Sequence, residues 1–424
     1  MPGPINSVPS MEIKHFSDEP PPGRMAPPGG SALHEVKSVG ATFAMVAGET
    51  SGDLLAGLLL EGLVKRWPQL SAYGIGGPNM AKRGFQAWWP SEKLAVRGYV
   101  EVLRHYRGIV AIREQLKQRL LHPADGQRPD IFIGVDAPDF NLDLEAALKA
   151  EGIRTVHFVS PSVWAWRADR LEKIRRSVDH VLCIFPFEPA LLATHGIAAT
   201  YVGHPLASVI PMQPDRTAAR RQLGLQAGDT VVAILPGSRK SEVQYLAKRF
   251  FAAAALVKRS HPAIKFIVPA VPALKIAIER LAQASGVGGS LQILDGQSHL
   301  ALAACDVALV ASGTATLEAA LFKRPMVIAY YMNWLSWRIM RRQKLQPWVG
   351  LPNILCKAFV VPELLQDAAT PAALADAVLL WIDAKSRQPE KITALEQRFT
   401  LLHVELQRDT SKLATDAIQN LLES

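Results

Sequence analysis

The chain has 424 residues, of which 49% are hydrophobic and 20% charged, so it has the composition of a soluble globular protein and the length for two domains. Its net charge of +9 favours a polyanionic partner: nucleic acid, an anionic membrane surface or a phosphorylated substrate. The longest apolar run, Phe250 to Val257, is far too short to cross a bilayer. Three scattered cysteines and the missing apolar core of a signal peptide indicate a cytoplasmic protein without a zinc site or a disulfide framework.

The chain begins with a proline-rich segment, residues 1–38, which has eight prolines in its first thirty positions. Such a composition cannot bury enough apolar surface to offset the entropy lost on ordering, so the sequence predicts a disordered tail. Short apolar runs then alternate with helical patterns and predict a first domain, residues 39–206, with a Rossmann-like doubly wound sheet. Its strands are expected at 42–47, 73–77, 131–135, 155–159, 181–185 and 200–202.

Polar residues follow two of these strands at the edge of the sheet where ligands bind in open α/β folds. Asp136 and Asp139 come directly after 131–135 and are candidate bases for removing a proton from a sugar hydroxyl. Either carboxylate could instead cap the helix that follows, and for Asp139 capping is at least as good an interpretation. Glu49, Ser51 and Asp53 follow the first strand and could orient an acceptor.

An amphipathic helix is expected between Leu94 and Leu121, after Gly98, with basic residues between its apolar positions. Most helices of this kind pack their apolar stripe on their own domain and leave the basic face in water. A basic surface with aromatic residues can also rest on lipid headgroups. Both interpretations stay open at this point.

A linker rich in proline and polar residues lies between Pro205 and Asp215, and the pattern then restarts in a second domain, residues 207–424. Two Rossmann-like domains in series, facing each other across a cleft, are therefore predicted. The last helix, about 395–422, could pack on either domain. The strands of the second domain are expected at 230–235, 264–268, 291–294, 307–311 and 326–330.

One glycine-containing loop of the second domain is P-G-S-R, residues 236–239, which follows a strand and precedes a helix. Gly237 permits close approach of a phosphate to the backbone, Ser238 adds a small polar residue, and Arg239 offers a planar fork that matches two phosphate oxygens. The simpler alternative is an exposed arginine after an ordinary strand-to-helix turn.

A second loop of this kind consists of Ser312, Gly313 and Thr314, with a helix expected from Thr316. Free N–H groups and the positive end of a helix attract phosphate, and Glu318 is close enough to reach a ribose hydroxyl beside it. An ordinary capped turn would look the same in isolation. Two such loops in one domain fit a nucleoside diphosphate better than chance, whereas no P-loop motif is present.

Residues 330–348, the basic-aromatic segment, combine three tryptophans, two tyrosines and four basic residues. RNA-binding proteins use such mixtures for stacking and phosphate contacts, and membrane-surface proteins use them at headgroups. A partly buried aromatic helix is the third interpretation.

Nine short motifs in this order resemble the lipid-A-disaccharide synthases, a family of GT-B-fold glycosyltransferases. They extend from about residue 40 to 420, and the run V-S-P-S-V-W-A-W-R is the most specific of them. The motifs are A-G-E-T-S-G-D (47–53), G-I-G-G-P (74–78), G-V-D-A-P-D-F-N (134–141), V-S-P-S-V-W-A-W-R (159–167), F-P-F-E (185–188), G-H-P-L (203–206), L-P-G-S-R-K-S-E-V (235–243), A-S-G-T-A-T-L-E (311–318) and L-P-N-I-L (351–355).

The resemblance implies a step in lipid A and lipopolysaccharide synthesis in Gram-negative bacteria. UDP-2,3-diacylglucosamine and 2,3-diacylglucosamine 1-phosphate (lipid X) would give the β-1,6-linked tetraacyl disaccharide 1-phosphate and UDP, with inversion at the anomeric carbon. Asp136 would be the base, Arg239 would hold the diphosphate, Glu318 the ribose, and Asn353 would lie near the nucleotide. No metal or cofactor is implied.

The resemblance also implies a peripheral protein on the inner face of the inner membrane, with no nucleic-acid partner, and leaves a homodimer open. Rivals are the transferase of the peptidoglycan lipid precursor, a UDP-GlcNAc 2-epimerase, and a non-catalytic membrane adaptor that binds nucleotide sugars. Two features depart from the family: the tail, and Arg97 in place of a methionine common before Gly98.

Overall fold

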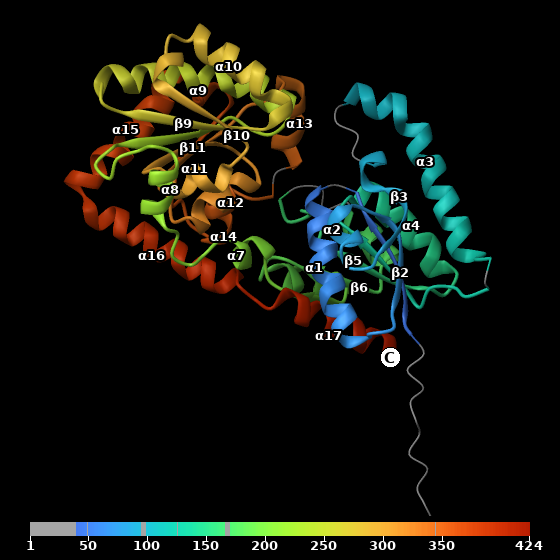
Figure 1. Cartoon of the computed structure of the whole chain (residues 1–424). Helices are drawn as coiled ribbons and strands as arrows, with labels where there is room; N and C mark the ends of the chain where they lie inside the picture. The colour runs from blue at the N-terminus through green and yellow to red at the C-terminus, as the bar shows by residue number, and fades with distance from the viewer. Residues whose placement is uncertain (1–39, 49, 95–98, 125, 166–169, 344) are drawn as a thin grey trace, which may run out of the picture. The chain divides into compact units, whose positions relative to one another are not determined.

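A computed structural model describes residues 40–424, apart from residues 49, 95–98, 125, 166–169 and 344. The described part contains two parallel β-sheets, each with helices packed on it (Figure 1). This arrangement confirms the predicted α/β class with two Rossmann-like sheets. The expected tail and Arg97 lie outside the described residues.

In the described part, the first sheet has the strand order β3-β2-β1-β4-β5-β6-β7, and every pairing in it is parallel. Its strands are β1 (Thr42–Ala47), β2 (Ser71–Gly76), β3 (Gln86–Pro90), β4 (Ile131–Val135), β5 (Arg154–Phe158), β6 (His180–Cys183) and β7 (Ala199–Tyr201). The helices along this stretch are α1 (Thr50–Arg66), α2 (Pro78–Ala81), η1 (Ser91–Lys93), α3 (Tyr99–Leu121), α4 (Pro138–Ala150), α5 (Arg170–Ser177), α6 (Glu188–Ala193) and α7 (Pro205–Val209).

Strand β1 illustrates why both faces of this sheet carry helices. Phe43, Met45 and Ala47 share one buried cluster with residues of α1, whereas Ala44 and Val46 share another with residues of α3 and α4. Successive side chains of a strand point to opposite faces, and all five are fully buried. Each large side chain buried in this way contributes about 1.5–3 kcal/mol to stability.

The second sheet has the order β10-β9-β8-β11-β12-β13, again with parallel pairings. Its strands are β8 (Val231–Leu235), β9 (Lys265–Ala270), β10 (Leu291–Asp295), β11 (Val307–Ala311), β12 (Met326–Tyr330) and β13 (Glu363–Leu365). The helices of this stretch are α8 (Arg216–Gln222), α9 (Lys240–Ser260), η2 (Pro272–Leu274), α10 (Lys275–Ala284), η3 (Gly288–Ser290), α11 (Ser298–Ala304), α12 (Thr314–Leu321), α13 (Trp334–Gln343), α14 (Leu351–Leu355), η4 (Gln366–Ala368), α15 (Pro371–Arg387), α16 (Pro389–Leu406) and α17 (Thr410–Glu423).

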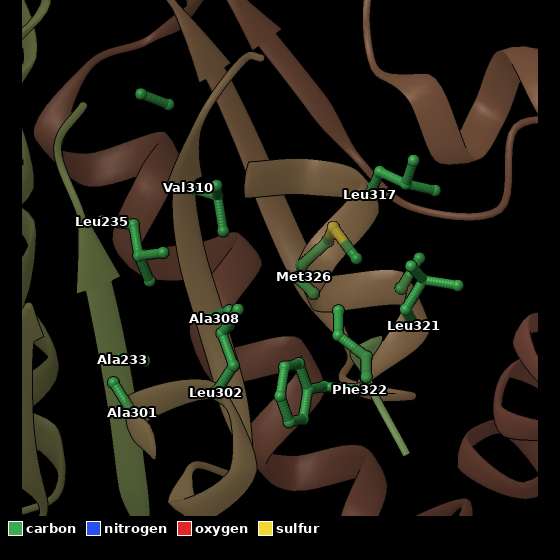
Figure 2. Close-up of a cluster of buried hydrophobic side chains, with 14 of the residues drawn as sticks. Ala233, Leu235, Ala301, Leu302, Ala308, Val310, Leu317, Leu321, Phe322 and Met326 are labelled. Atoms are coloured by element: carbon green, nitrogen blue, oxygen red, sulfur yellow. The ribbon is translucent and has the colours of Figure 1, made fainter. Parts of the chain in front are cut away.

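A dense apolar core fixes the central strands of the second sheet (Figure 2). Leu235 of β8 and Val310 of β11 lie in it together with Leu302 of α11 and Leu317 of α12. All of them are buried. Since interiors pack at the density of organic crystals, the loops that follow β8 and β11 start from fixed positions.

The longest apolar run of the sequence lies inside α9, where Phe250 and Phe251 are fully buried in the core. Its apolar character therefore serves packing within the domain. Within the described ranges, no helix is long and apolar enough to cross a membrane.

Three elements differ from the sequence-based expectation. Strands β3 and β13 were not expected. Strand β3 ends in W-W-P, and β13 has only three residues. The single helix expected over about 395–422 was wrong: α16 ends at Leu406 and α17 begins at Thr410. The break has a local cause, since the Asp409 carboxylate accepts a hydrogen bond from the Lys412 N–H at 3.0 Å and caps the new helix.

Helix α17 returns to the first sheet and packs beside α1 (Figure 1). The Ser411 hydroxyl donates to the Leu58 carbonyl at 3.1 Å, and Arg66 pairs with Asp416 at 2.5 Å. Gly62 permits this approach, because a Cβ there would lie 2.4 Å from the Ser411 hydroxyl oxygen. The boundary at residue 206 stays a prediction.

Candidate active site

Both sheets reverse their strand order at one point: between β1 and β4 in the first sheet, and between β8 and β11 in the second. Loops that leave the carboxyl ends of two such strands diverge to opposite faces and open a crevice where ligands bind in α/β proteins. The residues singled out from the sequence lie largely in these four loops.

In the first sheet, β1 ends at Ala47 and β4 ends at Val135, and these two residues are paired with each other. The loop after Ala47 meets the loop after Val135 directly, because a Cβ at Gly48 would lie 2.9 Å from that of Ala137. Ser51 is exposed in the first turn of α1, and Glu49 lies outside the described residues. The two polar loops predicted for the acceptor therefore adjoin each other.

Asp136 and Asp139 have different surroundings. Asp136 is half-buried, and its backbone N–H donates to the Phe158 carbonyl at 2.9 Å. In the part of the chain that the structure describes, nothing donates a hydrogen bond to its carboxylate. The Asp139 side chain is 85% exposed and pairs with Arg170 at 2.5 Å. Asp139 is thus held at the surface by a cation, while the Asp136 carboxylate has no such partner among the described residues.

Asp53 has a structural role in place of the expected role toward an acceptor. Its buried carboxylate accepts the N–H groups of Gly77, Asn79 and Met80 at 2.9–3.1 Å, and the Asn79 side-chain amide at 2.9 Å. These four bonds attach α1 to the turn at the start of α2. The G-I-G-G turn is therefore closed by a carboxylate of the chain itself.

In the second sheet, Leu235 and Val310 lie side by side at the ends of β8 and β11. Residues 236–239 and 312–314 thus start next to each other and precede helices α9 and α12; together they are called the cradle below. Gly237 has φ +114°, which favours glycine, and a Cβ there would lie 2.4 Å from that of Glu242.

A carboxylate of the chain occupies one side of the cradle. Glu242 accepts the N–H groups of Ser238 at 2.9 Å and Arg239 at 3.1 Å, and its other oxygen pairs with the Arg239 guanidinium at 3.0 Å. The Arg239 side chain is 77% exposed, so this ion pair is weak and easily exchanged. This role of Glu242 was not predicted from the sequence, although a glutamate three residues after the N-cap of a helix is a known capping signal.

The loop at β11 supplies a mixed set of groups. The Ser312 hydroxyl donates to the Val349 carbonyl at 3.3 Å, and the buried Thr316 hydroxyl donates to the Gly313 carbonyl at 2.8 Å. Gly313 and Thr314 are exposed at the start of α12, which begins two residues earlier than expected. Thr316 therefore stabilises the loop. The backbone N–H groups of the exposed Gly313 and Thr314 are accessible to a ligand.

Glu318 lies one turn into α12 and faces the start of α11. Its carboxylate is 3.4 Å from the Ser298 hydroxyl and 3.5 Å from His299 Nε2. Burial raises the pKa of this carboxyl, and the neighbouring imidazole opposes that shift. A half-buried carboxylate with long contacts has lone pairs left for a hydroxyl donor.

Asn353 lies one layer behind the cradle. It is fully buried, and its amide donates to Val361 and Glu363 while its oxygen accepts the N–H groups of Val360 and Val361, at 2.8–3.0 Å. Glu363 in turn accepts the N–H of Val349, whose carbonyl holds Ser312. Asn353 and Glu363 thus fix the turn that supports the cradle; Glu363, in a strand of three residues, gave no sequence signal.

The V-S-P-S-V-W-A-W-R motif contains Trp164, which binds the buried carboxylate of Glu188. Trp164 donates its indole N–H to Glu188 at 3.0 Å, and the Phe185 N–H donates to the other oxygen at 3.0 Å. Burial raises the pKa of Glu188 to about 7. The rings of His204 and Phe185 are tilted against each other with centroids 5.5 Å apart, and burial lowers the pKa of His204 to about 4, which indicates a structural residue.

The described residues contain no group of three or more His, Cys, Asp or Glu side chains that could hold a metal ion. The positive charge at the cradle comes from Arg239 and from the starts of α9 and α12, beside the negative charge of Glu242.

The profile of the family described as lipid-A-disaccharide synthetase matches residues 43–418. The chain belongs to this family. The lipid-A-disaccharide synthase of Albidiferax ferrireducens is 73% identical over 381 residues, which cover 90% of this chain and 97% of that protein. The enzyme of Verminephrobacter eiseniae is 65% identical with the same coverage. The chain is therefore a glycosyltransferase of the lipid-A-disaccharide synthase family.

Solved structures of low sequence identity show the same fold. Acinetobacter baumannii MurG matches with a TM-score of 0.52 at 14% identity, over 90% of this chain and 99% of that one. UDP-GlcNAc 2-epimerase from Neisseria meningitidis, bound to UDP-GlcNAc, matches with a TM-score of 0.58 at 11% identity, over 91% and 100%. The GT-B architecture predicted from the sequence is confirmed at the level of the fold.

Replacing Glu188 by Gln tests the buried carboxyl behind Trp164. Between pH 4.5 and 7 the folded protein keeps a proton on Glu188 that the unfolded chain has lost, so its contribution to stability falls as pH rises through this range. The unfolding free energy of the parent minus that of Glu188→Gln should decrease by about 3 kcal/mol from pH 4.5 to 7 in urea titrations.

Glu172→Gln is the control, because Glu172 is exposed and its pKa is lowered by Arg175. His204 is present in all three proteins and cancels in the differences. Equal pH dependence of the two variants would contradict the assignment to Glu188.

Proposed function

We propose that this synthase-family chain transfers 2,3-diacylglucosamine from UDP to O6 of 2,3-diacylglucosamine 1-phosphate, giving the β-1,6-linked tetraacyl disaccharide 1-phosphate and UDP. The family match over residues 43–418 carries the proposal. Two switch-point sites, one with an unengaged carboxylate and one with phosphate-binding loops, agree with it. The rivals predicted from the fold share only 10–14% identity in solved structures, and nothing favours a non-catalytic adaptor.

In the proposed step, O6 of the acceptor attacks the anomeric carbon of the donor and its proton passes to Asp136. The new O6–C1 bond forms as the bond from C1 to the β-phosphate oxygen breaks, and that electron pair leaves with UDP, so the anomeric centre inverts. Asp136 is favoured over Asp139 because Arg170 already neutralises Asp139. Ser51, in the first turn of α1, and Glu49, outside the described residues, would orient the acceptor.

The cradle would receive the diphosphate of the donor. The N–H groups of Ser238 and Arg239, now bound to Glu242, would turn to the phosphate oxygens together with those of Gly313 and Thr314. A diphosphate carries more charge than the Glu242 carboxylate, so the exposed Arg239 guanidinium would exchange partners. Glu318 would accept hydrogen bonds from the ribose, and Asn353 would act by supporting the cradle.

The basic-aromatic segment would hold the protein against the inner membrane surface, where both acylated substrates reside. On α13, Trp334 is 68% exposed, and Arg338, Arg341 and Arg342 are exposed at helical spacings that bring them to the same side. An exposed tryptophan beside three cations suits the headgroup region of an anionic leaflet. The side chains at the start of α3 lie outside the described residues, so this helix adds no support.

Replacing Asp136 by Asn tests the proposed base. The variant should lose on the order of 10²–10⁴-fold in kcat for disaccharide formation, while UDP affinity by calorimetry stays close to that of the parent. Asp139→Asn, which removes only an exposed ion pair, should keep kcat within a few-fold. Retained turnover in Asp136→Asn would remove Asp136 as base, and a strong loss in Asp139→Asn would reverse the two roles.

Charge reversal on α13 tests the proposed membrane contact. The triple change of Arg338, Arg341 and Arg342 to Glu should weaken binding to vesicles rich in anionic phospholipid at least about tenfold, because each surface cation contributes about 1 kcal/mol. The control reverses Arg221, Arg259 and Arg387, which are also exposed, with the same change in net charge. Equal loss of vesicle flotation in both variants would refute a localised contact.

A further inference from the structure

The turn that carries Asp136 has an unusual backbone. Asp136 has φ +53° and Ala137 has φ +44°, so two adjacent residues with side chains lie in the left-handed region. Such a conformation costs about 1–3 kcal/mol for each residue and persists only where the surrounding structure enforces it. The turn also sits at the switch point of the first sheet, where backbone strain is often functional.

Asn141 of α4 donates hydrogen bonds to the Asp136–Ala137 turn. Its side-chain amide donates to the Asp136 carbonyl at 2.8 Å and lies 3.5 Å from the Val135 carbonyl. Its own backbone N–H donates to the Ala137 carbonyl at 3.0 Å. One fully buried residue therefore contacts the carbonyls of both strained residues.

A buried acid–base pair lies behind Asn141. Glu145, one turn further along α4, contacts His157 of β5 at 2.8 Å, and both side chains are fully buried. Burial raises the pKa of the Glu145 carboxyl. Gly134 of β4 makes the space, because a Cβ there would lie 2.2 Å from the Glu145 carboxylate and 2.8 Å from the Asn141 Cβ.

The three polar side chains of Asn141, Glu145 and His157 destabilise the folded state. Asn141 Oδ1, Glu145 Oε2 and His157 Nε2 are all buried, and none has a hydrogen-bond partner in the described part of the chain. Each such atom costs about 1–3 kcal/mol, so apolar side chains at these positions would stabilise the domain better. A costly polar group beneath a strained turn at the proposed site indicates a role in function.

We propose that Asn141, supported by the Glu145–His157 pair, is a positioning residue that holds the Asp136–Ala137 turn in its left-handed conformation and so aims the Asp136 carboxylate at the acceptor hydroxyl. This inference rests on the proposed function, because it gives Asn141 a role only through Asp136.

The test combines Asn141→Ala with Ala137→Gly. Loss of the amide should release the turn and lower kcat on the order of 10²-fold with little change in KM, since small misplacements of a reacting group have effects of this size. Glycine adopts positive φ without steric cost, so adding Ala137→Gly should recover at least about tenfold of the lost kcat. Should Asn141→Ala fail to fold, Asn141→Ser, too short to reach the turn, takes its place in the same comparison.

Thr155→Val is the matched control. Thr155 is also a fully buried polar residue of the first sheet, and its hydroxyl donates to the Ser177 carbonyl at 3.1 Å, away from the switch point. It should lower the melting temperature and leave kcat unchanged. Parent-like kcat in Asn141→Ala, or a loss that Ala137→Gly does not recover, overturns the inference. Failure of the proposed function would differ, because the parent itself would then form no disaccharide.

Discussion

Loops that leave two paired strands of a parallel sheet toward opposite faces open a crevice at the carboxyl ends of those strands, and this constraint positions both candidate sites. The pairs β1–β4 and β8–β11 are the two places where it occurs. Apolar packing beneath them, such as Leu235 beside Val310, fixes where the loops begin. Most of the polar residues singled out from the sequence lie in the loops that follow these strands, where a crevice can open between diverging connections.

The two sites solve different electrostatic problems. In the reaction we propose, a carboxylate of the first sheet takes a proton; Arg170 pairs with Asp139, whereas the Asp136 carboxylate accepts no hydrogen bond from the described residues. In the second sheet, the same proposal requires a cation and several N–H groups that can bind a diphosphate. Glu242 holds Ser238 and Arg239 in place, and we propose that a more highly charged ligand replaces these contacts.

Buried strands bounded by breakers were predictable from sequence: β4, β11 and β12 have the expected bounds. Such runs are apolar throughout because helices cover both faces of the sheet. Edge strand β13 and the break before α17 were missed, since a three-residue strand carries little pattern and Asp409 acts through one local capping bond.

The loops of the candidate site were also predictable, because glycine, serine and charged residues follow the strands directly. The supporting residues were not. Asn353 carries no sign in the sequence that it binds Glu363 ten residues later, nor Asn141 that it binds the carbonyl of Asp136. These roles depend on backbone carbonyls and on side chains brought together by the fold, which periodicity and motif spacing do not encode.

A crystal structure of the protein with UDP bound tests the central claim most directly. We expect the diphosphate to lie over residues 236–239 and 312–314, with its oxygens accepting the N–H groups of Ser238 and Arg239. We also expect Glu242 to have released the Arg239 guanidinium. A diphosphate bound elsewhere, or one bound while Glu242 still holds both N–H groups and the guanidinium, would contradict the central claim.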